Sequence, residues 1–211
     1  RVEVDGRGAV SLFAEDGRAL AAFAPGAVPT ARRFTERVSM VLGFFDFRRS
    51  AETVHPARRF LGSTLDADTI TLRFEGDEGL AVAQAITVET PDVTTRITTT
   101  VSGLSDVASI ALPFACDADA SFVGFGEQYN QTDQRGEAFP LWVEEQGIGR
   151  ELRGAVAGNE HTTYFPMPWW IDWRGFGVMV DTPARTLVDL CVEDPEVASL
   201  MTFMNIPPRG T

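Results

Sequence analysis

The stretch VTTRITTTV, from Val93 to Val101, decides the fold class because its alternation is the clearest in the chain. Successive side chains of a β-strand point to opposite faces of the sheet. One face of this stretch would therefore carry Val93, Thr95, Ile97, Thr99 and Val101, and the other would carry three threonines and Arg96. This pattern predicts a half-buried strand with a polar outer face.

Strand patterns continue on both sides of this stretch. From Arg1 to Phe23, two Asp-Gly pairs separate apolar runs and predict hairpin turns with positive φ, hence a β-meander. Residues 29–49 fit a helical stripe as well as a strand, and we favour a strand for their second half. His55-Pro56 and the arginines after it are expected in a surface loop. Further strands are expected at 69–75, 110–114, 122–125, 162–165, 176–180, 186–192 and 200–204.

These strands are short, closely spaced and separated by turns, without a convincing long helix or an internal repeat. Such a chain is typical of an all-β fold, and specifically of an antiparallel β-sandwich. Strand runs punctuated by turns leave little room for a Rossmann or barrel domain.

A glycine-rich segment, GFGEQYNQTDQRGEAFPLWVEEQGIGR from Gly124 to Arg150, interrupts the strands. Dense glycine marks backbone with positive φ or a close approach to another surface, and the aromatic residues of this segment distinguish it from a tether. We expect an ordered loop rather than a packed β-ladder. Ordered loops on a β scaffold are common places for binding groups.

The composition excludes several classes of function. The 211 residues are 44% hydrophobic and carry a net charge of -12, with arginine as the only basic residue apart from two histidines. Nucleic acid and anionic membranes need a basic face, so neither is expected as a partner. No apolar run approaches a membrane span, and the first residues do not resemble a signal peptide, so a cytoplasmic location is expected. The chain starts without Met and is expected to be part of a longer protein.

Metals and cofactors are not expected. Cys116, Cys191, His55 and His161 lack partners at metal-ligand spacing. We interpret both cysteines as buried thiols, with a single disulfide as the alternative. Nothing in the sequence resembles a Ser/His/Asp arrangement, and His161 is expected to be structural.

Three groups of residues are candidates for a binding site. Glu144, Glu145 and Gln146 can hydrogen-bond sugar hydroxyls, although adjacent acids are more often simply solvated. Asp133 and Arg135 are expected to form an ion pair that holds the loop. Trp169, Trp170 and Trp173 could stack on sugars, but we expect at least two of the three in the core.

The segment from Val123 to Arg150 closely resembles the N-terminal domain of glycoside hydrolase family 31. The resemblance is carried by GFGEQ at 124–128, Asp133-x-Arg135-Gly136, Pro140-Leu141-Trp142 and EQGIGR at 145–150, in one order at close spacing. It continues weakly to Leu190. It implies a galactose-mutarotase-like β-sandwich placed before a (β/α)8 barrel that carries both catalytic aspartates.

The resemblance implies that the complete protein is a retaining α-glycosidase and that this segment alone is not catalytic. By motif position, Glu145 would contact the hydroxyls of the carbohydrate substrate, with Gln146 and Gln128 as further substrate-binding candidates. The family often has Asp at the position of Glu145. The spelling EQGIGR is similar to the sulfoquinovosidase branch, but an Arg-x-x-Trp pair for a sulfonate is absent here, so a neutral α-glucoside is favoured. The alternatives are a sulfoquinovosidase, a non-catalytic carbohydrate-binding sandwich and a mutarotase-like epimerase. The oligomeric state is left open.

Overall fold

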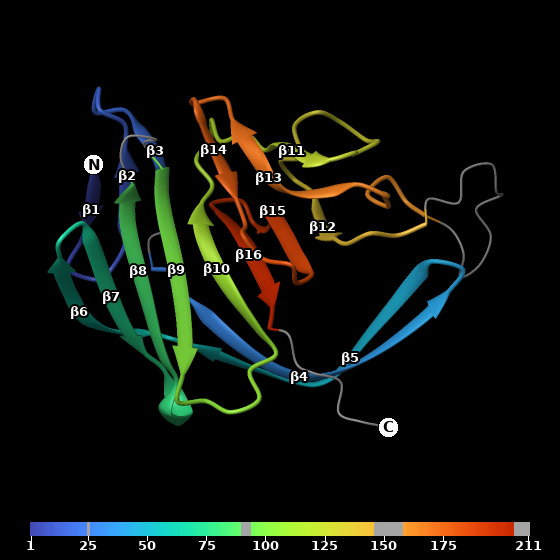
Figure 1. Ribbon diagram of the computed structural model, residues 1–211, viewed down its shortest axis with the longest axis horizontal. Helices are drawn as coiled ribbons and strands as arrows, with labels where there is room; N and C mark the ends of the chain where they lie inside the picture. Colours follow the sequence, from blue (N-terminus) through green and yellow to red (C-terminus); the bar gives the residue numbers. More distant parts are fainter. Residues whose placement is uncertain (25, 90–93, 146–157, 205–211) are drawn as a thin grey trace.

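The computed structural model describes residues 1–24, 26–89, 94–145 and 158–204, and these form four antiparallel sheets. Figure 1 shows a curled half-barrel of strands from which one long hairpin extends. The described part of the chain has no α-helix, only a one-turn 3₁₀ segment at Asp77–Gly79. It accordingly has no helix long and apolar enough to cross a membrane. The predicted all-β antiparallel sandwich is confirmed.

Two sheets form the end of the molecule that contains the N-terminus (Figure 1). The three-stranded sheet consists of β1 (Val2–Val4), β2 (Val10–Phe13) and β3 (Ala19–Ala22). The four-stranded sheet consists of β6 (Arg59–Asp66), β7 (Thr69–Glu75), β8 (Ala81–Glu89) and β9 (Thr94–Ser102). The predicted meander is thus confirmed, and so is the half-buried alternation of β9 over its described residues.

The other two sheets carry the glycine-rich segment. The six-stranded sheet is ordered β12 (Ala138–Leu141), β15 (Thr186–Asp194), β16 (Val197–Phe203), β10 (Ser109–Ala115), β4 (Thr30–Val41) and β5 (Phe44–Pro56). The last sheet is ordered β11 (Val123–Gly126), β13 (Pro166–Asp172) and β14 (Phe176–Met179).

Each pair of sheets encloses its own hydrophobic core. The first core lies between the sheet of β6–β9 and the meander and includes Leu72, Phe74, Val82 and Ile86. The second core lies between the β11–β13–β14 sheet and β12, β15 and β16, and includes Phe125, Phe139, Trp170 and Leu190. Phe114 on β10 packs against both cores. The glycine-rich segment is therefore anchored by large aromatic side chains.

Several sequence predictions are wrong in detail. The strand favoured for the second half of residues 29–49 is confirmed, and the first half, at Thr30–Val41, is a strand as well. The surface loop expected at His55-Pro56 is wrong, because His55 is only 6% exposed in β5. The reason is pairing, since β4 and β5 form one long hairpin whose register aligns Ala31 with His55. Residues 162–165 are not a strand, and residues 138–141 of the expected loop are one, because Phe139 and Leu141 face the second core.

The two cysteines form a disulfide, Cys116–Cys191, which corrects the interpretation as free thiols. Cys116 follows β10, and Cys191 lies at a bulge of β15 where its φ is +72°. Both strands pair with β16, so the sheet brings together residues 75 positions apart in the sequence. Sequence spacing alone gives no hint of this proximity.

Candidate functional site

The segment Trp142–Glu145 leaves β12 and lies between the β4–β5 hairpin and residues 163–164. The backbone N–H of Glu144 donates to the carbonyl of Thr163 at 3.0 Å, and that of Glu145 donates to the carbonyl of Gly43 at 3.0 Å. Both Phe45 and Phe47 of β5 meet the Trp142 ring edge-to-face, with centroids 5.7 and 5.9 Å away. The hairpin thus fixes the candidate site from one side.

Adjacent Glu144 and Glu145 have different environments. The Glu144 carboxylate turns toward the hairpin and accepts the N–H of Phe45 at 3.3 Å. Burial raises the pKa of Glu144, against the lowering effects of that hydrogen bond and of nearby Arg185. The Glu145 carboxylate instead accepts a hydrogen bond from the Tyr164 hydroxyl. Glu144 therefore supports the hairpin, while Glu145 is held on the side of Tyr164.

A cavity of about 520 Å³ opens beside these residues. Its lining includes Trp142, Glu144, Glu145, Tyr164, Pro166 and Pro168. A mostly apolar wall with a few placed polar groups is typical of sites for small molecules, and it suits a sugar with one apolar face and several hydroxyls. Among the residues proposed to bind substrate, Glu145 lines this cavity, and so does the neighbouring candidate Glu144.

Arg185 ties the hairpin to the strands behind the cavity. It is 5% exposed, lies over the rings of Phe47 and Phe203 at 3.5 and 4.0 Å from their centroids, and pairs with Glu36 of β4. Burial lowers the pKa of Arg185, and the hydrogen bond to Glu36 opposes that shift. The planar guanidinium thus joins the hairpin, through Phe47 and Glu36, to Phe203 of β16.

Gln128 has a different environment from Glu145. Its Oε1 lies 2.8 Å from Nδ1 of His161, and the other ring nitrogen of His161 lies 3.3 Å from Glu137. The imidazole stacks on Phe139 with centroids 4.3 Å apart. Gln128 thereby helps to orient a buried histidine, in agreement with a structural role for His161. It is not among the residues that line the cavity, and its predicted contact with substrate stays a prediction.

Gln146 lies outside the described residues, so its predicted role stays a prediction as well. The glycines at the start of the segment act as expected. A Cβ on Gly124 would lie 2.7 Å from the Trp169 carbonyl oxygen, and one on Gly126 would lie 2.0 Å from that of Phe165. Close approach of β13 therefore requires both glycines. Between them, Phe125 adopts φ +68° and is fully buried.

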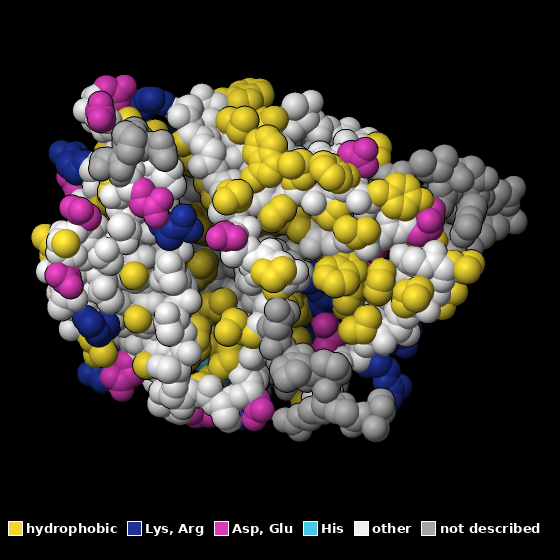
Figure 2. Space-filling model, viewed as in Figure 1, with side chains coloured by type: hydrophobic (Ala, Val, Ile, Leu, Met, Phe, Trp, Pro, Cys, Tyr) yellow, Lys and Arg dark blue, Asp and Glu magenta, His cyan; other side chains and the backbone are white. Residues whose placement is uncertain are grey.

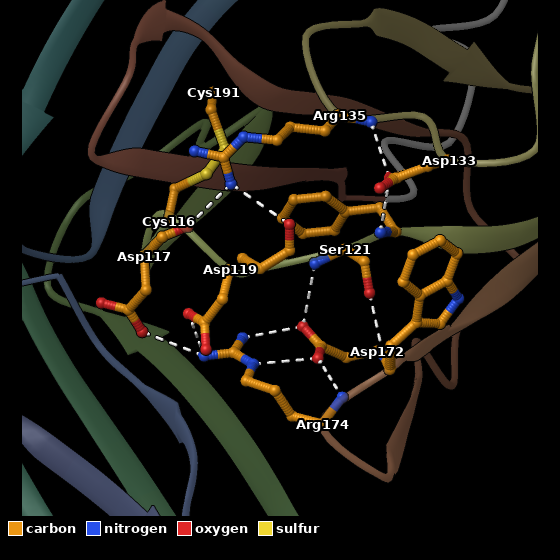
Figure 3. A network of polar contacts seen from close by, with 12 residues as sticks. Cys116, Asp117, Asp119, Ser121, Asp133, Arg135, Asp172, Arg174 and Cys191 are labelled. Carbon is orange, nitrogen blue, oxygen red and sulfur yellow. Dashed lines mark hydrogen bonds and ion pairs between the residues drawn. A yellow bond between two sulfur atoms is a disulfide. The ribbon is translucent and has the colours of Figure 1, made fainter.

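The predicted Asp133–Arg135 ion pair is wrong, although both residues do hold the loop. Asp133 accepts the backbone N–H groups of Phe122 and Arg135 at 2.9 and 3.1 Å. The Arg135 guanidinium instead donates to the carbonyls of Asp117 and Ala120, as Figure 3 shows. Asp133 therefore holds the loop through backbone N–H groups, one two residues ahead within its own turn and one in the segment before β11.

A buried ion pair that the sequence analysis missed lies beside this loop (Figure 3). Asp172 is 2% exposed and receives two bonds from the Arg174 guanidinium, at 2.9 and 2.7 Å, and one from the N–H of Ser121. Burial alone would raise the pKa of Asp172, but the hydrogen bonds from Arg174 and Ser121 lower it overall. The signal in the sequence was an Asp-x-Arg turn, the same spelling as at Asp133.

This network orients Trp173, whose backbone N–H donates to Ser121 Oγ at 2.8 Å and which is 73% exposed. Trp170 is buried and Trp169 is half-buried, so the prediction that at least two of the three belong to the core is wrong. Cross-strand pairing places Trp169 opposite Met179, which is 70% exposed, and Ile171 opposite Gly177. Figure 2 shows hydrophobic side chains gathered over β13 and β14.

No group of three or more His, Cys, Asp or Glu side chains that could hold a metal ion occurs among the described residues. The arrangement at Glu145 instead offers a carboxylate, a phenol hydroxyl and apolar walls. Such groups bind and orient a hydroxylated ligand.

Comparisons with known proteins agree with the fold. Sulfoquinovosidases of Agrobacterium fabrum and Escherichia coli are 32% and 33% identical to the chain over 88 and 82 residues. These matches cover 37% and 34% of this chain but only 13% and 12% of the relatives. A family 31 sulfoquinovosidase from E. rectale, solved with an aza-sugar inhibitor, shares the fold with a TM-score of 0.77 at 19% identity. That match covers 96% of this chain and 30% of the solved one.

The family model described as the glycosyl hydrolase 31 N-terminal galactose mutarotase-like domain matches residues 63–189, which is more than half of the chain. The match includes all of the described segment from β7 to Glu145 and continues through β13 and β14. The chain therefore belongs to the family of N-terminal galactose mutarotase-like domains of glycosyl hydrolase 31.

Proposed function

We propose that this domain belongs to a retaining α-glycosidase that hydrolyses α-sulfoquinovosides, and that it forms one wall of the substrate pocket. Both relatives that match by sequence are named sulfoquinovosidases, and this supports a sulfonated sugar better than the neutral α-glucoside expected from the sequence. The chain spans only 12–13% of those relatives and 30% of the solved enzyme. The substrate and the reaction of the complete protein are accordingly part of the proposal.

The position of Glu145 carries this proposal. Glu145 lines the cavity beside Tyr164 and Trp142, where the β4–β5 hairpin meets the segment that follows β12. A carboxylate offers two acceptor oxygens, and such a group at a cavity wall can hydrogen-bond the hydroxyls of a sugar. Glu145 would orient the sugar, and the attacking carboxylate and the acid/base would come from a downstream barrel. In a retaining glycosidase those two carboxyl groups lie about 5 Å apart.

The apolar face of β13 and β14 supports a neighbouring domain of the same chain as the partner. Ile171, Trp173 and Met179 are 46, 73 and 70% exposed, and Tyr164 and Phe165 extend the patch toward the cavity. Large exposed apolar patches commonly mark interfaces. We propose that the (β/α)8 barrel covers this face and thereby closes the pocket over Glu145.

One observation favours a second candidate function, a sandwich that binds carbohydrate without chemistry. The indole of Trp173 is exposed enough to stack on a sugar. A Trp173→Ala variant separates the two functions. Under the first, the complete protein loses stability between its domains, and sugar affinity is unchanged in the folded fraction. Under the second, the variant keeps its stability and loses sugar affinity.

The substrate is tested with the complete protein and two aryl substrates, 4-nitrophenyl α-sulfoquinovoside and 4-nitrophenyl α-glucoside. We expect a kcat/KM at least about 100-fold higher for the sulfonated sugar, since a lost charged contact costs about 3 kcal/mol. Equal kcat/KM values, or a higher value for the glucoside, would contradict the sulfonated substrate and favour a neutral α-glucoside. No hydrolysis of either would contradict the α-glycosidase.

We also propose a cytoplasmic location, as the sequence predicts. The Cys116–Cys191 disulfide is the observation that opposes it, because cytosolic thiols are generally kept reduced. Alkylation of the protein in intact cells distinguishes a cytoplasmic location from an oxidising compartment. Two trapped thiols would support the cytoplasm, and an oxidised pair would contradict it.

A further inference from the structure

A second cavity, of about 400 Å³, is lined by residues of the Asp5–Ala9 turn and of β6, β7 and β8. Figure 1 shows these elements at the end of the molecule away from β12 and the tip of the β4–β5 hairpin. The turn Asp5–Ala9 and the segment 26–29 form one side of it. The sheet of β6, β7 and β8 forms the other side through Phe60, Phe74 and Gln84. Nothing in the proposed function uses this cavity.

Gln84 is the unusual residue of its lining. The side chain is 1% exposed, yet its Oε1 has no hydrogen-bond partner among the described residues. The residue opposite it on β9 is Thr99, and the Thr99 hydroxyl is also buried without a described partner. Buried polar atoms are nearly always hydrogen-bonded, because an unpaired one loses its hydration without compensation. Gln84 also lines the cavity, so a ligand there is a candidate donor for this acceptor.

The walls around Gln84 are aromatic and close-fitting. The rings of Phe60 and Phe74 lie 5.3 Å apart between centroids. Gly8, at φ +85°, packs closely against both rings, since a Cβ at this position would come within 2.7 Å of Phe60 and 2.9 Å of Phe74. Such ring faces suit the apolar C–H face of a small cyclic molecule.

The mouth of the cavity is positive although the chain is strongly acidic. Arg7, Arg58 and Arg59 line it, with Asp5 as the only carboxylate among the described residues of the lining. The Asp5 carboxylate accepts the N–H groups of Arg7 and Ala9 at 2.7 and 2.9 Å, and Arg59 pairs with Glu75. Arg58 is exposed and has no ion pair within the described residues. A free guanidinium at the mouth favours an anionic group there.

We propose that this cavity binds a monosaccharide acid, a sugar ring that carries one anionic group. A ring hydroxyl donates to Gln84 Oε1, the C–H face lies on Phe60, and the anionic group meets Arg58. The site is separate from the Glu145 cavity and binds its ligand without chemistry.

The test uses the complete protein and isothermal titration with D-glucuronate, with D-glucose and inorganic sulfate as partial probes. Three variants are compared with the wild type. Arg58→Gln removes the charge at the mouth, Gln84→Leu removes the acceptor at similar volume, and Arg37→Gln is the matched control. Arg37 is an exposed arginine of the hairpin that does not line this cavity.

We expect D-glucuronate to bind the wild type and the Arg37→Gln variant equally, with about tenfold weaker binding to Arg58→Gln, the loss expected for one charge-assisted contact. Gln84→Leu should abolish binding, and glucose or sulfate alone should bind more weakly than glucuronate. If Gln84→Leu does not fold, the exposed Arg58 position still decides. Absent binding, or equal binding to wild type, Arg58→Gln and Gln84→Leu, would overturn the proposal. Equal binding to all three proteins would mean that glucuronate binds elsewhere and that Gln84 holds only a buried water.

Discussion

The backbone N–H of Glu145 donates to the carbonyl of Gly43 at 3.0 Å, so the tip of the β4–β5 hairpin is bound directly to the candidate site. These two residues are about 100 positions apart in the sequence. A Cβ on Gly43 would lie 3.0 Å from the Cβ of Glu145, and the φ of Gly43 is +87°. The position of the carboxylate thus depends on a glycine in another part of the chain.

Gly43→Ala should therefore disturb the site. The strained φ and the close contact predict a loss of about 1–2 kcal/mol in unfolding free energy and a lower kcat/KM in the complete protein. Urea unfolding and steady-state kinetics measure the two effects. Gly17→Ala is the control, because Gly17 has a similar φ of +85° in a turn with open space around it. If both variants lose stability but retain full activity, Gly43 has no influence on Glu145.

Glu144→Gln should stabilise the protein slightly at pH 7. Burial raises the pKa of Glu144 in the folded state. Ionising this carboxyl therefore destabilises the folded state once the pH exceeds the pKa of Glu144 in the unfolded chain. The amide still accepts the N–H of Phe45 but carries no charge. Because the group is half-exposed, we expect a gain below about 1 kcal/mol. Thermal melts should show the gain at pH 7 and its disappearance near pH 4, and a variant less stable at pH 7 would contradict this account.

Asp172→Asn should be strongly destabilising, since it leaves the Arg174 guanidinium without its buried partner. We expect a loss of about 3 kcal/mol at pH 7. The pKa of Asp172 is lowered in the folded state, so its contribution is present above pH about 4 and lost as the pH falls further. Asp119→Asn is the control, because Asp119 is 75% exposed and lies 4.0 Å from the same guanidinium. Equal unfolding free energies for the two variants would show that burial of Asp172 is unimportant.

Reduction of the Cys116–Cys191 bond should also lower stability. It closes a loop of 75 residues, for which chain entropy predicts about 4 kcal/mol. Urea midpoints with and without reductant measure this difference. The double variant Cys116→Ala/Cys191→Ala should not respond to reductant. Indifference of the wild type to reductant would show that the bond contributes nothing.

The sequence predicts most of the fold because alternation is a local property. Ile70, Leu72 and Phe74 share one face of β7 as expected, and β9 alternates as expected over its described residues. The failures concern long-range pairing. His55 is buried because β4 lies beside it, and Cys116 meets Cys191 because β16 lies between their strands.

The site was predicted only in part, for the same reason. Motif position led to Glu145, and the structure places that residue on a cavity. Nothing in the local sequence indicated that Tyr164 would bind the Glu145 carboxylate or that Gly43 would bind its backbone. Nor did it distinguish the exposed Trp173 from the buried Trp170, which differ in whether they face the second core.

The most direct test of the central claim is kcat/KM of Glu145→Gln in the complete protein with 4-nitrophenyl α-sulfoquinovoside. Loss of a charge-assisted hydrogen bond to the sugar should cost about 1–3 kcal/mol, or roughly 5- to 150-fold, with the unfolding free energy nearly unchanged. Tyr164→Phe should show a smaller loss, because it removes only the group that holds the carboxylate. Unchanged kcat/KM in a folded Glu145→Gln variant would contradict the claim that this domain contributes to substrate binding through Glu145.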